Sequence, residues 1–187
     1  MKKYLFQSLL IIIIGSLGVP QKLAAQSVPG DSILSMLVKD WERAKAYTDE
    51  YLAAMPSNKY SFKAQDSVRS FAQQMLHLAQ GTMFLINNAT DAKPTFAGRD
   101  LEKTMSAQSA DSVKYYVDKS YDFAINSIKN TNPSMLWEMK TVNMGRPLGA
   151  TRMSWMMKAF EHQTHHRGQT TIYLRVAGLK PPQEKLF

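Results

Sequence analysis

Residues 161–169, EHQTHHRGQ, hold three of the four histidines of this 187-residue chain. His162 and His166 are four positions apart, which on an α-helix places both side chains on one face, a turn apart. His165 shares its side of the helix with charged and polar residues, so we expect it to be exposed. The face of the first two is predicted to point inward, because it continues through Trp155, Ala159, Thr170 and Tyr173.

Two imidazoles at this spacing can bind one divalent cation, but the same spacing occurs where a helix places satisfied polar residues near a core. The remaining histidine, His77, lies between two leucines in a second helical pattern. Gly81 follows it by one turn, and Gly168 stands beside His166. A glycine inside a helix is unfavourable, so we expect both glycines to mark a close approach of a neighbouring helix or a ligand.

Apolar residues recur every three or four positions in four long segments, which predicts four amphipathic helices. Almost no stretch alternates with a period of two, and the connection over residues 130–150 is predicted to pack over the domain. The expected fold class is therefore all-α, a four-helix bundle. The first predicted helix begins at its cap, either Asp31 or Ser32, and ends at Ala54. The other three run from Asp66 to Asn88, from Asp111 to Lys129 and from Thr151 to Ala177.

The N-terminus has the layout of a secretory signal peptide. Lys2 and Lys3 precede an apolar stretch from Tyr4 to Val19, and small residues follow at positions 24 and 25. We expect residues 1–25 to be cleaved, residues 26–187 to form one domain, and the mature protein to be exported to the periplasm. The alternative is that the segment stays uncleaved and anchors the protein in a membrane, although its apolar stretch is short for a spanning helix. We expect no other association with a membrane.

The charge and the cysteine content limit the partners and the metal ligands that this chain can have. Loss of residues 1–25 removes three lysines and no acid, so the formal charge falls from +8 to +5. The remaining basic residues are scattered, and no nucleic-acid partner is expected. The chain has no cysteine, which excludes disulfides and thiolate ligands. The methionines, including Met153, Met156 and Met157, follow packing stripes, which favours core positions over a copper site.

Several stretches resemble a known family. The segments HQTHHRGQ and YLRVAGLKPP, with the histidine in MPSNKYSFKAQDSVRSFAQQMLHLAQ, are similar to the DinB/YfiT-like superfamily of metalloenzymes, over about residues 31–182. The resemblance implies an up-down-down-up bundle with a divalent metal, zinc or nickel, in its centre. It also implies that His77, His162 and His166 bind this metal, and that the chain forms a homodimer.

Two classes of function are compatible with these features. The first is a metal-dependent enzyme acting on a small molecule, either hydrolytic or, as the resemblance implies, transferring a low-molecular-weight thiol. Export to a compartment poor in such thiols makes hydrolysis at least as plausible. No catalytic base stands out, because Glu161 points away from His162, and Arg167 could hold an anion or form a salt bridge. The second class is a non-catalytic metal- or ligand-binding module.

Overall fold

The computed structural model describes residues 29–96 and 98–187. The predicted signal peptide, residues 1–25, lies outside these ranges. Within them, no helix is both long enough and apolar enough to cross a membrane.

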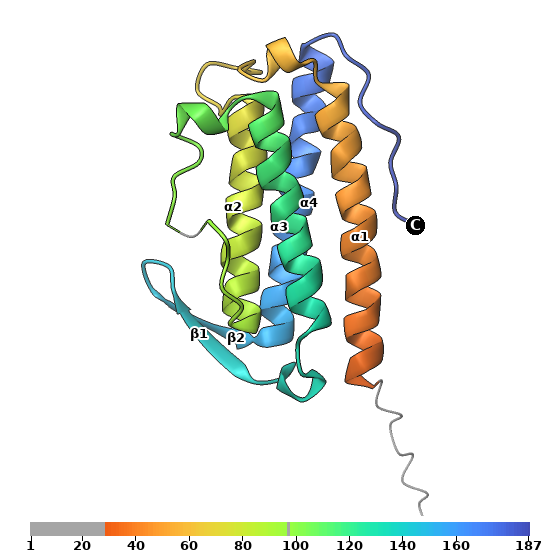
Figure 1. Cartoon of the computed structure of the whole chain (residues 1–187), viewed down its shortest axis with the longest axis vertical. Coiled ribbons are helices and arrows are strands. Elements are labelled where there is room, and N and C mark those ends of the chain that lie inside the picture. The colour runs from red at the N-terminus through yellow and green to blue at the C-terminus, as the bar shows by residue number, and fades with distance from the viewer. Residues whose placement is uncertain (1–28, 97) are drawn as a thin grey trace, which may run out of the picture.

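Four long helices run alongside one another and form an all-α bundle (Figure 1). The chain ascends in the first helix, descends in the second and third, and ascends in the fourth, which confirms the up-down-down-up arrangement. The second helix packs most extensively against the fourth and then against the third. The helices are α1 (Gly30–Ala54), α2 (Phe71–Thr90), α3 (Ala110–Lys129) and α4 (Arg152–Val176).

The start of α2 differs from the prediction by about a turn. Ser70 caps the helix, its hydroxyl accepting from the backbone of Gln73, while the Gln73 side chain accepts from the backbone of Ser70. This reciprocal pair fixes the first turn, so Asp66, the predicted start, lies before the helix. Val68, which continues the apolar period of the helix in the sequence, also lies before it and is 39% exposed. Helix α1 begins at Gly30, directly after Pro29. The predicted cap residues, Asp31 and Ser32, therefore lie inside the helix and do not cap it.

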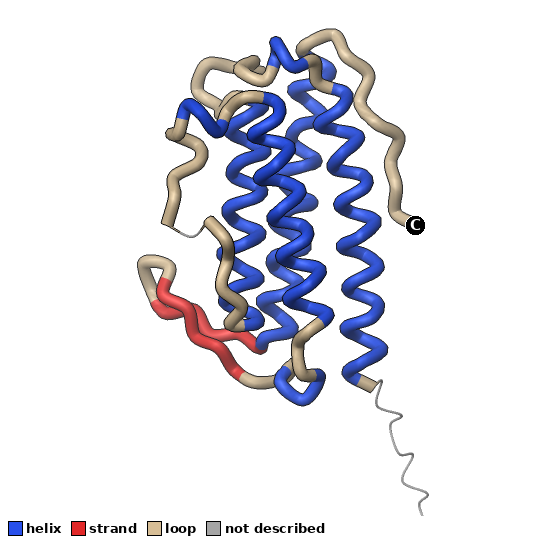
Figure 2. Tube along the Cα trace, viewed as in Figure 1, coloured by secondary structure: helices blue, strands red, loops and turns tan. Residues whose placement is uncertain are grey.

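The segment between α3 and α4 contains a β-hairpin, where the sequence predicted an irregular connection (Figure 2). Strands β1 (Met139–Asn143) and β2 (Pro147–Thr151) pair antiparallel, and Gly145 in their turn has a φ of 83°. Val142 is the only fully buried residue of the two strands, so they lack the alternating apolar pattern that identifies a half-buried strand. Three short 3₁₀ turns complete the fold, η1 (Ser57–Lys59), η2 (Met105–Ala107) and η3 (Pro133–Met135).

Arg152, at the start of α4, ties the hairpin to the end of α2. Its guanidinium pairs with Asp91 (2.8 Å) and Glu138 (3.1 Å) and donates to the carbonyl of Ala89 (3.0 Å). Asp91 ends α2 in the left-handed conformation, with φ 62°. These contacts hold the three elements together at the end of the bundle remote from residue 70.

The centre of the bundle contains a buried polar layer. The Tyr121 hydroxyl donates to Oε1 of Gln163 (2.8 Å) and lies 2.7 Å from the hydroxyl of Thr48. Arg167 also donates to Gln163 (3.0 Å), and its guanidinium stacks over Tyr47 at 4.5 Å. Arg167 is therefore buried in the bundle, and within the described residues it forms no salt bridge.

The methionines of α4 follow the prediction only in part. Met156 is fully buried and Met153 partly so, but Met157 is 46% exposed. Met157 is one position beyond the buried face, and on a helix one position turns the side chain by about 100°.

Candidate metal centre

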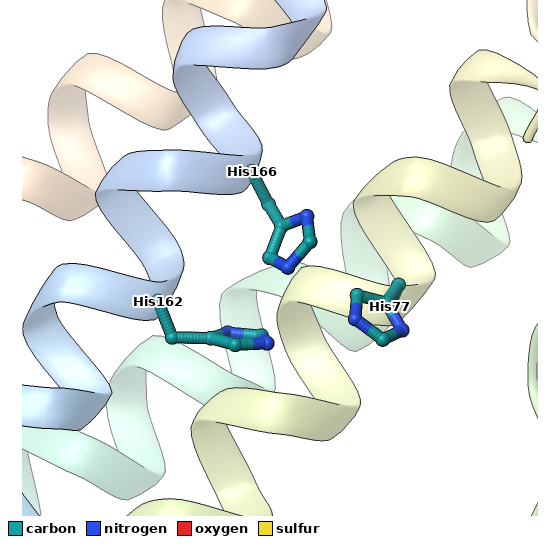
Figure 3. Close-up of side chains that lie close together, drawn as sticks. All are labelled: His77, His162 and His166. Atoms are coloured by element: carbon teal, nitrogen blue, oxygen red, sulfur yellow. The ribbon is translucent and has the colours of Figure 1, made fainter. Parts of the chain in front are cut away.

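Helices α2 and α4 bring three histidines together at their contact. His77 comes from the second turn of α2, and His162 and His166 come from successive turns of α4 (Figure 3). The ring centroid of His77 lies 5.4 Å from the centroid of His162 and 4.5 Å from the centroid of His166. The centroids of His162 and His166 are 4.3 Å apart. One ring nitrogen from each residue lies within 4.8 Å of the other two.

Burial keeps two of these rings neutral. It lowers the pKa of His162 to about 4, helped by the nearby His166 and His77. Burial likewise lowers the pKa of His166 to about 4, with His77 as the next contribution. A neutral imidazole has a free lone pair, which is the form that binds a metal ion.

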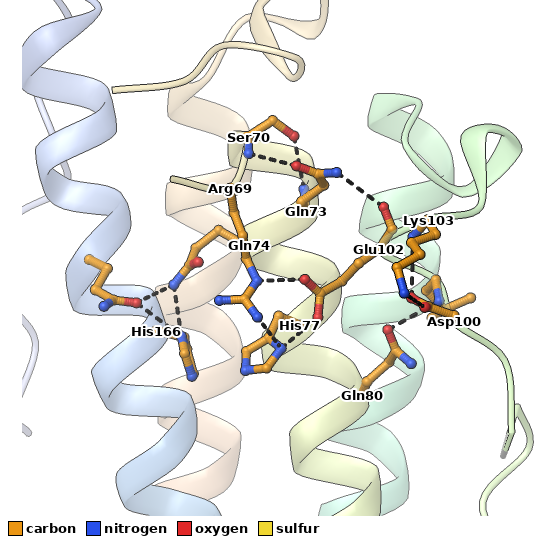
Figure 4. Close-up of polar contacts among 12 residues, drawn as sticks. Arg69, Ser70, Gln73, Gln74, His77, Gln80, Asp100, Glu102, Lys103 and His166 are labelled. Atoms are coloured by element: carbon orange, nitrogen blue, oxygen red, sulfur yellow. Dashed lines mark hydrogen bonds and ion pairs between the residues drawn. The ribbon is translucent and has the colours of Figure 1, made fainter. Parts of the chain in front are cut away.

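Glu102 orients the ring of His77 from outside the helices (Figure 4). Its Oε1 lies 2.6 Å from Nδ1 of His77, and its Oε2 accepts from Nε of Arg69 at 2.5 Å. Burial raises the pKa of Glu102, but the hydrogen bonds from Arg69 and His77 outweigh this and leave the pKa below its usual value. A carboxylate on Nδ1 keeps the hydrogen there and directs the Nε2 lone pair to the opposite side of the ring.

Two glutamines hold the ring of His166. Its Nδ1 lies 3.0 Å from Oε1 of Gln169, one turn later on α4, and 2.7 Å from Nε2 of Gln74 on α2. Gln74 also donates to Gln169, so the two amides form a bridge between the helices. The two contacts require different tautomers of His166, because the Gln74 amide nitrogen donates and the Gln169 oxygen accepts. In the tautomer whose Nδ1 carries the hydrogen and donates to Gln169, Nε2 is left free to act as a ligand.

The ring of His162 lies directly over Gly81 of α2. A Cβ atom on residue 81 would lie 2.5 Å from Nε2 of His162, and closer still to Cε1, so no larger residue fits without displacing the ring. Nδ1 of His162 is buried and has no hydrogen-bond partner in the described part of the chain. Such an unpaired atom is costly in a protein interior, and coordination of a cation is one way to satisfy an imidazole nitrogen.

The donor set fits a divalent metal ion. Zinc–nitrogen bonds are about 2.0–2.1 Å long, so ligands that share one ion lie roughly 3–4 Å apart. The 4.8 Å limit on the three nitrogens therefore requires only small rotations of the rings. Three neutral nitrogens leave an ion its full charge and at least one position for another ligand.

The structure also places the other residues that the sequence singled out. His165 is exposed, as predicted, and so is Glu161, the acidic residue next to His162. Thr170 hydrogen-bonds only to the backbone of its own helix. Gly168 meets no atom within 4 Å of a Cβ position, so the expectation of a close approach was wrong there and right at Gly81.

Glu102 and Arg69 were not anticipated. Glu102 lies in the connection from α2 to α3, and Arg69 comes just before the cap of α2. Neither position belongs to a helical periodicity. The signal available in the sequence was only an acidic residue in a long polar connection, and such residues are usually solvated.

Two cavities flank the three histidines. One, of about 600 Å³, is lined by His77 and His162 together with residues of α2, the α2–α3 connection and the hairpin. The other, of about 940 Å³, is lined by His166 and His165 together with Arg69 and Gln169. Glu102 borders both cavities. The cluster is thus accessible to small molecules from two sides.

Comparison with known proteins agrees with this architecture. The family model described as the DinB family matches residues 27–186. The crystal structure of a DinB-like protein from Bacillus cereus ATCC 10987 is similar in fold, with a TM-score of 0.66 and 20% sequence identity, over 81% of this chain and 97% of that chain. No curated protein matches the sequence. Because the family match extends over most of its length, the chain belongs to the DinB family.

Proposed function

We propose that this protein is a divalent-metal-dependent enzyme that acts on a small molecule, with His77, His162 and His166 as the metal ligands. The observation that carries the proposal is the meeting of three imidazole nitrogens within 4.8 Å, between two cavities. Zinc and nickel both bind nitrogen ligands of this kind, and neither needs a thiolate.

A metal ion bound here would lower the pKa of a coordinated water or hold an anionic group of a substrate. The protein's own residues have definable tasks. Glu102 and Gln169 orient two of the imidazoles, and Gly81 leaves space for the third. The two cavities give a substrate access to the open side of the cluster.

Hydrolysis is the reaction that these features support first, because it requires one organic substrate and water. The second cavity supports thiol transfer as the other candidate, because that reaction must hold two organic molecules at one centre. The wall of this second cavity carries Arg69, Gln169 and His165, polar groups that suit a charged cosubstrate.

The ligand assignment is tested by elemental analysis of the purified mature protein and of two variants. We expect His162→Ala to lose the bound metal and His165→Ala to keep it, since His165 is adjacent in sequence but exposed and outside the cluster. Equal metal content in His162→Ala and the unaltered protein would contradict the assignment.

Catalysis needs a separate test. The metal-loaded protein is assayed against chromogenic esters and amides, and against a chromogenic aryl halide with and without cysteine as the thiol. Turnover that disappears in His166→Ala would support an enzyme, and dependence on cysteine would identify the transferase. A loaded protein without turnover in either assay would favour the non-catalytic binding module.

Two further proposals concern the protein in its cell. We propose that residues 1–25 are removed on export, which N-terminal sequencing of the protein from a periplasmic fraction tests; an intact Met1 would contradict it. We also propose a homodimer, consistent with the family resemblance. A sedimentation experiment that yields only monomer would contradict this second proposal.

A further inference from the structure

The cavity beside His77 and His162 has largely apolar walls. Its volume of about 600 Å³ lies in the range of small-molecule sites. Its walls come from α2, the connection from α2 to α3 and the turn of the hairpin, and His162 of α4 completes the lining. The apolar lining residues are Met83, Phe84, Leu85, Pro94, Phe96 and Met144.

Phe84 continues the line of the metal cluster along α2. It follows His77 by seven residues, two helical turns, so both side chains lie on one face of the helix. Gly81 lies between them, and the ring of His162 covers it. The surface therefore runs without interruption from two imidazoles to an aromatic side chain.

Two of the apolar side chains in this wall are in contact with water. Phe84 is 42% exposed and Met144 is 50% exposed, although they line one cavity from separate elements. Burial of such surface by a ligand is favourable in proportion to the apolar area removed from water. A ligand that fills the cavity would cover both side chains.

The carboxylates around this cavity are already paired. Asp100 forms an ion pair with Lys103 (2.9 Å), and Glu102 interacts with Arg69 and His77. Neither is an unpaired negative charge that would repel an anionic head group. Arg99, also in the lining, adds a positive charge.

We propose that this cavity is the subsite for the apolar part of an amphiphilic substrate, whose oxygen-bearing head binds at the three histidines. The substrate class is a small molecule with an alkyl or aryl group attached to a carboxylate-like or carbonyl head. This inference rests on the proposed function, because the head requires the metal ion.

The test uses the zinc-loaded full mature protein and a series of alkyl hydroxamic acids, from acetohydroxamic to octanohydroxamic acid. Hydroxamates chelate zinc through the same head at every chain length, so differences in affinity report on the chain alone. Isothermal titration calorimetry should show binding that tightens about fourfold for each methylene that enters the cavity. An affinity that does not change with chain length would overturn the proposal.

A pair of variants locates the chain. Phe84→Ala removes one wall of the proposed subsite, and Ile172→Ala removes a similarly exposed apolar side chain (56%) from the wall of the other cavity. We expect the chain-length dependence to weaken in the first variant only. Weakening in Ile172→Ala alone would place the alkyl chain in the other cavity and overturn the assignment.

The failure of this proposal is distinguishable from the failure of the proposed function. Elemental analysis of the loaded protein comes first, and a protein that retains no zinc contradicts the metal centre itself. A protein that retains zinc and binds every hydroxamate with one affinity keeps its metal centre but has no apolar subsite.

Discussion

At residue 81 the absence of a side chain makes room for the imidazole of His162. We predict that Gly81→Ala displaces this ring and weakens metal binding by about tenfold or more, as when a group that orients a ligand is lost. Competition titration against a chelator of known affinity measures the change. Unchanged affinity would show that His162 does not need the space over residue 81.

Gly168 is the matched control on the other helix. A Cβ there would meet nothing within 4 Å, so Gly168→Ala should leave metal affinity unchanged. It should also raise the free energy of unfolding by up to about 1 kcal/mol, because alanine favours the helix over glycine. Urea denaturation measures this difference.

Glu102 is the charged group that fixes His77. We predict that Glu102→Gln lowers metal affinity by about tenfold, since an amide holds Nδ1–H less strongly than a carboxylate and outer partners contribute about 10–100-fold. Asp100→Asn is the control, because Asp100 borders the same cavity but pairs with Lys103. The same titration compares both variants, and an equal loss in each would indicate only a general effect of charge.

At this scale the sequence could predict the histidines, and Gln169 beside them on the same helix, but not Glu102, which orients His77. His162 and His166 lie on one helix, so their common face follows from the helical period, and His77 stood out as the remaining histidine. Glu102 reaches His77 from a connection whose path depends on tertiary packing. No local pattern specifies that path.

Among the elements, α1, α3 and α4 meet through the Tyr121 hydroxyl. We predict that Tyr121→Phe lowers the free energy of unfolding by about 1 kcal/mol. The loss is modest because Gln163 still accepts from Arg167, and Thr48 still donates to the carbonyl of Ala44. Tyr115→Phe, an exposed change on the same helix, should fall within about 0.5 kcal/mol of the unaltered protein. Denaturant titration measures both, and an equal effect in the two variants would contradict the role of the buried layer.

The junction of α2, the hairpin and α4 should depend on pH. Hydrogen bonds from Lys140 and Arg152 lower the pKa of Asp91 in the folded protein. The ion pairs therefore stabilise the fold above the unfolded pKa of this carboxyl, near 4, and their contribution is lost as the pH falls through the lowered folded value.

Asp91→Asn tests this dependence, because asparagine tolerates the left-handed backbone at this position. We expect the variant to be less stable than the unaltered protein at neutral pH, with the difference disappearing in acid. Thermal unfolding at several pH values measures it, and a difference that persists in acid would contradict the electrostatic explanation.

The elements themselves were predictable where their pattern was long. Each of the four helices repeats its apolar period over several turns. The boundaries differ from the prediction by one or two residues, except at the start of α2, which is five residues later than predicted. The hairpin was missed because β1 and β2 have five residues each and bury little. Its stability comes from contacts at its base, such as Arg152 with Glu138, which only the folded chain brings together.

For the whole molecule, a metal ion at the three histidines would join α2 to α4, the most extensively packed pair of helices. His77 is far in sequence from His162 and His166, so the site exists only in the folded chain. A ligand that binds only the folded state stabilises it, by about 2.7 kcal/mol at a free concentration of 100 times Kd. For a chain of this size that corresponds to a rise in Tm of roughly 5–10 °C.

We therefore predict that zinc or nickel raises the Tm of the mature protein by this amount and that a chelator reverses the effect. His165→Ala should show the same rise, because its side chain is exposed and outside the cluster. His162→Ala should show none. Differential scanning calorimetry compares the three proteins, and an equal rise in His162→Ala would mean that the ion binds elsewhere. The experiment thus tests the link between α2 and α4 without requiring a substrate.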